Sequence, residues 1–156
     1  MAAFRCAVHQ ITWERDLEKA LDDIGAWGYP GTETFSYVVQ EFAGREAEFK
    51  AMLDARGLQL AALYSDDNMY EPGVESETIE RNLEIVRFLQ AMGSDILVYG
   101  PGRPRPRPDP IEPVHFEVMA RIVNEVGRAS QEMGVTTTIL LPAGKPVNRP
   151  STHNGK

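Results

Sequence analysis

The stretch AMGSDILVYGPG, from Ala91 to Gly102, holds the pattern that decides the fold of this 156-residue chain. It contains the end of an amphipathic helix, a glycine at position 93 and a short apolar run from Asp95 to Tyr99. Glycine often ends a helix because it adopts the left-handed backbone conformation without strain. A helix that ends in glycine and runs at once into an apolar strand is typical of a βα repeat.

The same order of helix, glycine and apolar run recurs along the chain. The helix-ending glycines Gly28, Gly57, Gly93 and Gly134 lie 29, 36 and 41 residues apart. These intervals fit βα units, and the continuous apolar character of the runs favours parallel strands joined by helices. The predicted strands are residues 4–11, 32–35, 58–64, 95–99 and 135–141, and the predicted helices begin near residues 16, 41, 76 and 113.

Caps and apolar spacing predict further details of the helices. One unbroken helix is expected from Glu41 to Arg56, and Ser76 is expected to cap the third helix. The fourth helix, from about Pro113 to Met133, is expected to bury an apolar stripe that includes Phe116. The acidic segment 65–75 lacks the residue spacing of an EF-hand calcium loop, so it is predicted to be a solvated loop.

Two α/β architectures fit four βα units followed by a fifth strand. A doubly wound sheet of five strands is complete at this length, whereas a (βα)₈ barrel needs at least about 200 residues. From periodicity alone the doubly wound sheet is favoured, as a module that binds a small molecule. No GxGxxG or GxxxxGK[ST] motif follows a predicted strand, so neither common phosphate-binding loop is indicated.

Composition and charge exclude several classes of function. The formal net charge of −7 argues against general affinity for nucleic acid or anionic membranes. The chain has no apolar run of the ~20 residues that a membrane span requires, and its single cysteine suits a reducing cytoplasm. Residues 142–156 hold Lys145, Arg149 and Lys156 and no acid. We therefore expect an α/β domain over residues 1–141 and an irregular basic tail over 142–156.

Three phrases of the sequence resemble the xylose isomerase-like superfamily of TIM barrels. They are GYPGTETFSYVV at residues 28–39, FKAMLDARGLQLAALYS at 49–65 and AMGSDILVYGPG at 91–102. This superfamily includes sugar (phosphate) isomerases and epimerases and AP endonuclease family 2 proteins. The resemblance covers roughly residues 4–140, in the right order, and implies the N-terminal half of a barrel.

The resemblance implies an enzyme, a sugar or polyol (phosphate) isomerase or epimerase that depends on a divalent metal such as Mn²⁺ or Mg²⁺. The metal ligands of the family usually lie on strands five to eight, and LLPAG stands where a His- or Glu-bearing phrase is expected. We therefore expect a chain shortened before those strands, and we assign no metal ligand. An alternative is a non-catalytic half barrel that associates with a second copy, because an open sheet leaves both edges unpaired.

Residues at the carboxyl ends of parallel strands meet on one face, where active sites of such folds lie. His9 and Glu33 are the candidate catalytic residues, and the resemblance places Glu33 at the mouth of the barrel. Either residue has a structural alternative, as a hydrogen-bond donor to the backbone or as half of an ion pair. The candidate contacts for a sugar-like substrate are Trp13, Tyr64, Tyr99, Arg103 and Arg105.

Each of these contacts also has a structural reading. Aromatic residues at strand ends often close the top of a core. The proline-rich segment 100–110 carries Arg103 and Arg105, which suit an anion, a partner domain that binds polyproline, or simple exposure to solvent.

Overall fold

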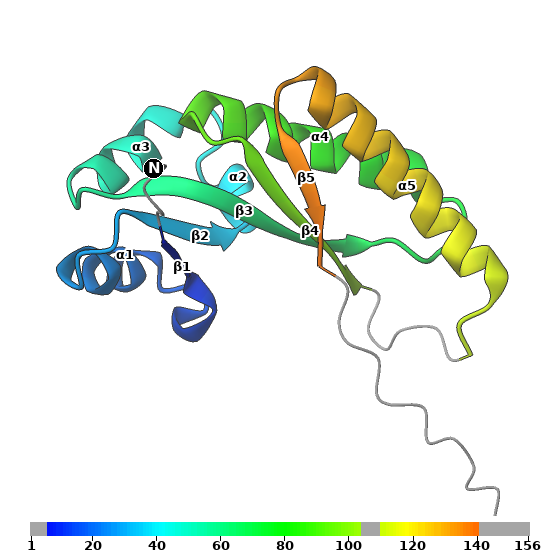
Figure 1. Cartoon of the computed structure of the whole chain (residues 1–156), viewed down its shortest axis with the longest axis horizontal. Helices are drawn as coiled ribbons and strands as arrows, with labels where there is room; N and C mark the ends of the chain where they lie inside the picture. The colour runs from blue at the N-terminus through cyan, green and yellow to red at the C-terminus, as the bar shows by residue number, and fades with distance from the viewer. Residues whose placement is uncertain (1–5, 104–109, 141–156) are drawn as a thin grey trace, which may run out of the picture.

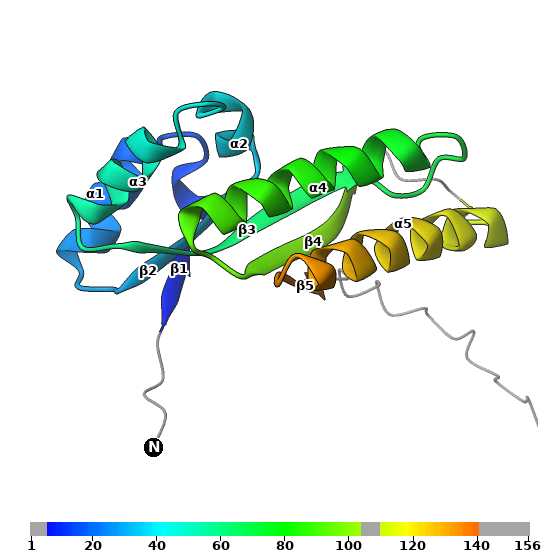
Figure 2. The same ribbon diagram turned by 90° about the horizontal axis from the view of Figure 1, so that it is seen from above.

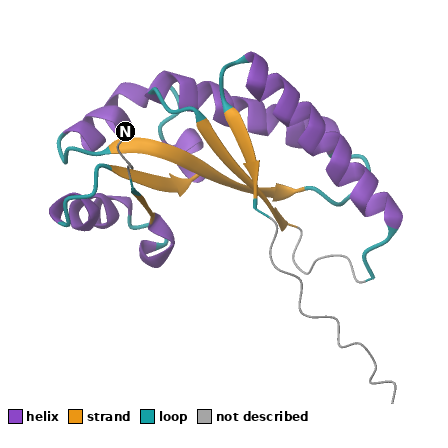
Figure 3. Ribbon diagram, viewed as in Figure 1, coloured by secondary structure: helices purple, strands orange, loops and turns teal. Residues whose placement is uncertain are grey.

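The computed structural model describes residues 6–103 and 110–140, which form one sheet of five parallel strands with helices (Figures 1 and 3). The strands are β1 (Ala7–His9), β2 (Gly31–Phe35), β3 (Gln59–Asn68), β4 (Ile96–Arg103) and β5 (Thr136–Ile139). The helices are the 3₁₀ turn η1 (Gln10–Trp13), α1 (Leu17–Ala26), α2 (Tyr37–Glu41), α3 (Glu46–Asp54), α4 (Glu75–Met92) and α5 (Pro113–Glu132).

The strand order is β1-β2-β3-β4-β5, without reversal. Right-handed crossovers between consecutive neighbouring strands all place their helices on the same side of a sheet. Figures 1 and 2 show α3, α4 and α5 along the convex side of the curved sheet. A doubly wound sheet would reverse its order at a switch point, so the structure rules out that alternative and shows a partial barrel.

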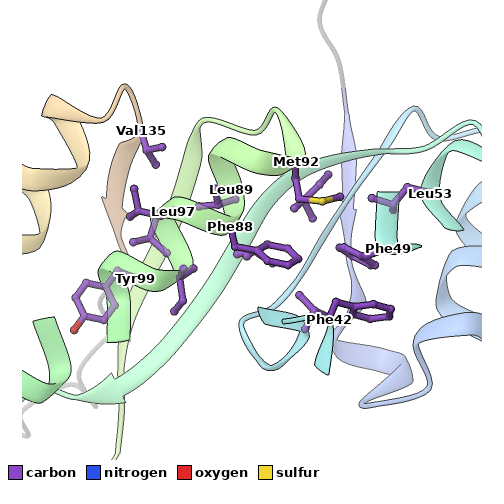
Figure 4. Packing of buried hydrophobic residues seen from close by; sticks show 14 of the residues in the cluster. Phe42, Phe49, Leu53, Phe88, Leu89, Met92, Leu97, Tyr99 and Val135 are labelled. Carbon is purple, nitrogen blue, oxygen red and sulfur yellow. The ribbon is translucent and has the colours of Figure 1, made fainter. Parts of the chain in front are cut away.

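The hydrophobic core lies between the sheet and its helices. Three aromatic rings form its centre: Phe42 stacks on Phe49 with ring centroids 5.0 Å apart, and Phe88 lies 6.0 Å beyond Phe49 (Figure 4). This burial of large apolar side chains stabilises each helix against the sheet. Further core residues with no exposed surface are Leu21, Ile24, Val38, Leu63, Val86, Leu89, Leu97, Val118, Ile122 and Val126.

The predicted helix 41–56 is wrong, because two helices occupy this region. Helix α2 ends at Glu41 and α3 begins at Glu46, and Gly44 takes a φ of +71° between them. Arg45 Nη2 donates a hydrogen bond to the carbonyl oxygen of Glu41 over 2.6 Å, which supports the break. A glycine at positive φ does not fit a helix interior. By contrast, all four glycines predicted to end helices adopt positive φ.

Two further expectations about helices are corrected. Helix α4 begins at Glu75 with Val74 as its N-cap residue, so Ser76 lies inside the helix. Phe116 of α5 is 53% exposed, and the buried stripe of this helix is formed by Val118, Ile122 and Val126. Helix α5 packs on α4 and β5, whereas Phe116 lies on the exposed side of the helix.

Candidate functional site

The concave site is a group of four side chains, His9, Glu33, Phe35 and Tyr64, at the carboxyl ends of the first three strands. The sheet register pairs His9 with Glu33 and Phe35 with Tyr64. Side chains alternate between the two faces of a strand, so register partners point to the same face. These four residues therefore gather on the face that the helices leave open.

His9 and Glu33 form a pair whose geometry fixes the position of a proton. The backbone N–H of Ile11 donates a hydrogen bond to His9 Nδ1 over 3.0 Å, so the neutral imidazole carries its hydrogen on Nε2. His9 Nε2 lies 3.3 Å from Glu33 Oε1. The arrangement directs an N–H donor at the carboxyl group.

Partial burial shifts the pKa values of His9 and Glu33 in opposite directions. Desolvation lowers the pKa of His9 and raises the pKa of Glu33, because burial disfavours the charged form of each group. Both side chains still reach solvent on the concave face, with exposed fractions of 28% and 23%. The pair joins a neutral donor to a carboxyl group whose titration moves toward neutral pH, a combination common at sites of proton transfer.

Two aromatic rings enclose the histidine. The ring of His9 meets Phe35 edge to face at 4.9 Å between centroids, and Tyr64 at 5.9 Å. Phe35 and Tyr64 also meet edge to face, at 5.8 Å. Such T-shaped contacts hold all three rings in fixed orientations.

Two glycines of β4 make room on the concave face. A Cβ atom added to Gly100 would lie 2.8 Å from the hydroxyl oxygen of Tyr64, and one added to Gly102 would overlap Asp66. The side chains of Tyr64 and Asp66 therefore lie across β4, over positions where only glycine fits. The GPG sequence at 100–102 thereby positions two side chains of β3.

A cleft of about 660 Å³ opens beside the concave site, at the carboxyl ends of β2 and β3. Phe35 borders both the cleft and the concave site. The rest of the wall combines aromatic, acidic and basic groups, including Arg15, Tyr37, Asp66, Asp67 and Arg81. Clefts at the carboxyl ends of strands are the usual ligand sites of parallel α/β folds.

Comparison with known proteins supports this architecture. No protein-family model matches the chain. In sequence it is 29% identical over 109 residues to the rhizopine catabolism protein MocC of Rhizobium meliloti, covering 64% of this chain and 32% of that protein.

Solved structures match nearly the whole chain. A sugar phosphate isomerase/epimerase from Parabacteroides distasonis superposes with a TM-score of 0.65 at 18% identity, over 94% of this chain and 57% of that one. A D-allulose 3-epimerase from Methylomonas sp. superposes with a TM-score of 0.70 at 16% identity, over 85% of this chain and 49% of that one. A xylose isomerase domain protein from Alicyclobacillus acidocaldarius superposes with a TM-score of 0.68 at 22% identity, over 88% of this chain and 50% of that one.

The chain has the fold of half a xylose isomerase-like TIM barrel. It spans about half the length of these solved structures and about a third of its curated relative. The half barrel contains β1 to β5, and the concave site lies on the face that corresponds to the interior of a closed barrel.

Tyr99, predicted to contact substrate, lies on the opposite face of the half barrel. It has no exposed surface, and its hydroxyl oxygen accepts a hydrogen bond from Asn82 Nδ2 at 3.2 Å. Burial raises the pKa of the Tyr99 hydroxyl. Its position is that of a core residue, because the strand alternates and Tyr99 points toward α4 while Val98 shares a register position with Tyr64.

Asn82 is the residue at this polar centre that the sequence analysis missed. Besides Tyr99, its side-chain N–H groups bond Asp67 Oδ2 at 3.1 Å and the carbonyl oxygen of Thr78 at 2.8 Å. Its carbonyl oxygen accepts from Ser65 Oγ at 2.8 Å. The signal was present in the sequence as an asparagine on the apolar stripe of α4, where a polar group needs buried partners.

Part of the acidic segment 65–75 is not a solvated loop. Strand β3 continues through Asn68, and Asp67 is only 7% exposed. Asp67 accepts from the Asn68 backbone N–H at 2.7 Å and from Asn82, and Arg81 Nε lies 3.2 Å away as an ion pair. Burial raises the pKa of Asp67, and these three partners counteract the shift.

The remaining predicted contacts lie apart from the concave site. Trp13 donates its indole N–H to Asp23 Oδ2 at 2.8 Å and packs against Trp27, so it anchors η1 on α1. Arg103 ends β4, but its side chain lies outside the described part of the chain, as do Arg105 and the tail 142–156.

The described residues do not fit the divalent metal that the family resemblance implies. Among residues 6–103 and 110–140 there is no group of three histidine, cysteine or carboxylate side chains placed to hold an ion. In the concave site, His9 Nδ1 already accepts a backbone hydrogen bond and Nε2 faces Glu33. In the same part of the chain, no helix has the length and apolar character to cross a bilayer.

Proposed function

We propose that the concave site catalyses proton transfer in the isomerisation or epimerisation of a sugar or polyol. The observation that carries the proposal is the His9–Glu33 pair, with its fixed tautomer and opposed pKa shifts, on the face that corresponds to a barrel interior. The solved structures that share the fold include sugar epimerases and an isomerase/epimerase. Because the chain spans about half of each, the activity of the whole proteins comes to it only as part of this proposal.

In the proposed chemistry Glu33 is the base. Its carboxylate removes a proton from the carbon beside a carbonyl group, and the C–H bonding pair forms an enediolate. The Nε2–H of His9 donates a hydrogen bond to the negative oxygen of that enediolate. Return of the proton to the neighbouring carbon, with a hydroxyl proton moving between the two oxygens, completes an aldose–ketose isomerisation.

Epimerisation needs one group more than the pair provides. The proton must return to the opposite face of the same carbon, which a single carboxylate on one side does not reach. His9 and Glu33 therefore suit isomerisation best, and epimerisation requires an acid on the other side of the sugar. Phe35 and Tyr64 present aromatic surfaces to the apolar face of a sugar ring.

Solvent exchange tests the proposal directly. The purified chain is incubated in D₂O with D-fructose or D-allulose, with and without Mn²⁺, and NMR follows loss of the C–H signal beside the carbonyl. We expect exchange that falls at least about 100-fold in Glu33→Gln, the usual loss on removing a general base. Glu117→Gln, an exposed change on α5, is the matched control and should keep the rate. Absence of exchange with both sugars contradicts the proposal.

We further propose that a second copy of the chain supplies neighbours for the outer strands. Within the described sheet, β1 and β5 each have one paired neighbour, and Leu140 beside β5 is 53% exposed. The N–H groups of Thr136 and Leu140 bond the β4 side, so by alternation those of Thr137 and Ile139 point to the free edge.

An edge-blocking substitution tests this association. Ile139→Pro removes an outward N–H and leaves the β4–β5 hydrogen bonds in place. Sedimentation equilibrium should show a dimer or higher oligomer for the parent chain and a shift toward monomer for the variant. A parent chain that stays monomeric at high concentration contradicts the proposal.

Location in the cytoplasm and the absence of nucleic-acid binding stay predictions from the single cysteine and the acidic charge.

A further inference from the structure

Arg15 differs from the other basic residues in its lack of a carboxylate partner. Within the described part of the chain, no carboxylate oxygen lies within 4.0 Å of its side-chain nitrogens. Every other lysine or arginine whose side chain is described has such a partner: Lys19, Arg45, Lys50, Arg56, Arg81, Arg87, Arg121 and Arg128. Arg15 is also part of the wall of the cleft beside the concave site.

A strained turn holds Arg15 in this position. The backbone N–H of Asp16 bonds the carbonyl oxygen of Trp13 at 2.9 Å, and Glu14 has φ 53° and ψ −109°. These angles are those of the first central residue of a type II′ turn, a position that favours glycine. Glu14 is the one described non-glycine residue with positive φ. Arg15 follows as the second central residue, where the turn directs it over α2.

The guanidinium of Arg15 is held over an aromatic ring. Its Cζ lies 5.0 Å from the centroid of the Tyr37 ring, within the range of a cation–π contact. This contact orients the guanidinium and leaves its N–H groups without a competing carboxylate. A planar guanidinium held in this way is suited to bind the paired oxygens of a phosphoryl or carboxylate group.

We propose that Arg15 binds an anionic oxygen group, phosphoryl or carboxylate, of the ligand that occupies the cleft. The inference rests on the proposed function, because it assigns to that sugar or polyol a negatively charged end. Ser36 and Gln40 also border the cleft and add a hydroxyl and an amide donor to its wall. Phe35, shared by the cleft and the concave site, places the uncharged end of the same ligand toward His9 and Glu33.

Negative side chains near Arg15 oppose the anion and give the proposal a second test. Glu14, Asp66 and Glu84 border the same cleft, and Glu41 and Asp16 influence the titration of Tyr37. Their repulsion weakens the binding of any anion that does not contact the guanidinium directly. Removal of one of these charges should therefore strengthen binding of the same ligand that loss of Arg15 weakens.

Calorimetry with four probes tests the assignment: D-fructose 6-phosphate, D-fructose, D-gluconate and inorganic phosphate. We expect the phosphate ester to bind about 10-fold more tightly than D-fructose, because a hydrogen bond from a guanidinium to a charged oxygen is stronger than one between neutral groups. Binding of D-gluconate with the same advantage identifies a carboxylate as the anion, whereas preference for the ester identifies a phosphoryl group. Tight binding of inorganic phosphate alone, with no gain for either sugar derivative, overturns the proposal.

Variants separate Arg15 from a general charge effect. Arg15→Gln should abolish the preference for the anionic sugar, Arg15→Lys should keep part of it, and Glu41→Gln should increase it. Arg128→Gln on α5 changes the net charge equally and should have no effect. Equal affinity for sugar and ester, or a preference that persists in Arg15→Gln, overturns the inference.

NMR of the same samples distinguishes this outcome from failure of the proposed function. If D-fructose perturbs the His9 ring resonances but the ester has no advantage, the anion site is wrong and the proposed function stands. If the ester binds through Arg15 without perturbing His9, the anion site stands and the proposed function is contradicted.

Discussion

Glu33 and Asp67 are two carboxyl groups on neighbouring strands, and they face opposite sides of the sheet. Burial raises the pKa of both. Asp67 has donors from Asn68 and Asn82 and an ion pair with Arg81, whereas Glu33 pairs with His9 Nε2 at 3.3 Å and reaches solvent on the concave face. A carboxylate whose lone pairs are filled holds structure together, and one with spare lone pairs beside solvent is available to a substrate. The difference separates a structural acid from a candidate catalytic one.

Asn82→Ala should have the largest effect on stability. It removes hydrogen bonds at a fully buried side chain and leaves Ser65, Asp67 and Tyr99 without their shared partner. We expect a loss of about 3 kcal/mol in the free energy of unfolding, measured with urea. Glu33→Gln should cost less than about 1 kcal/mol, and Asn124→Ala, an exposed change on α5, should be neutral. A similar cost for Asn82→Ala and Glu33→Gln would remove the distinction between the two sides.

Gly102→Ala should have the next largest effect, on the concave side. The added Cβ would overlap Asp66, so β3 or β4 must shift, at a cost of about 2 kcal/mol. The matched change is Gly127→Ala in α5, where an added Cβ meets nothing within 4 Å. There the free energy of unfolding should rise by roughly 0.5–1 kcal/mol, because alanine favours a helix interior. Stabilisation by Gly102→Ala would show that the concave face is not packed as described.

Trp13→Phe separates a structural aromatic from those of the concave site. It removes the indole hydrogen bond to Asp23, and we expect a loss of about 1 kcal/mol in thermal or urea unfolding. D-fructose binding should be unchanged, in contrast to Tyr64→Ala. Weaker sugar binding by Trp13→Phe, with stability intact, would restore Trp13 to the substrate contacts.

The pH dependence of stability should show the smallest effects, with opposite signs. Above its ordinary pKa of 4.5, Glu33 is protonated more in the folded than in the unfolded chain, so the free energy of unfolding falls as pH rises through its raised pKa. Below 6.5 the unfolded chain protonates His9 more readily, so the free energy of unfolding rises as pH rises toward 6.5.

Urea titrations of variants between pH 4 and 7 separate these contributions. Glu33→Gln should make the stability rise more steeply with pH, and His9→Asn should make it fall more steeply. The raised pKa of Asp67 also makes the free energy of unfolding fall as pH rises, and this contribution is the same in both variants. Unchanged slopes in both variants would show that the pair is not desolvated.

The sequence predicted the order of elements well because helix ends and apolar runs are local features. The glycines that end helices, the β4 run and the positions of His9 and Glu33 followed from spacing and resemblance, and the structure brings His9 and Glu33 together. The strand order could not be predicted from periodicity, because a half barrel and a doubly wound sheet share the same βα pattern. The side to which a strand residue points depends on register, and Tyr99 was misplaced for that reason.

Other features of the site came from packing that a single sequence does not display. Asn82 of α4 bonds Ser65 and Asp67 of β3 and Tyr99 of β4, which lie 15 to 17 positions from it along the chain. Arg15 depends on a turn in which glutamate occupies a position typical of glycine. The sequence pattern indicated instead the arginines of the proline-rich segment as candidate contacts for an anion, because charge and proline content can be seen in the sequence itself.

The unreversed strand order has a consequence for how the chain folds and opens. Within the described sheet each strand pairs only with its neighbours in sequence, and the densest pairing lies between β3 and β4. Cooperative contacts therefore spread along the chain in one dimension, much as in repeat proteins. Opening should begin at the outermost strands and reach the centre last. Amide hydrogen exchange should then be slowest in β3 and progressively faster toward β1 and β5, a gradient that a closed ring of strands would not produce.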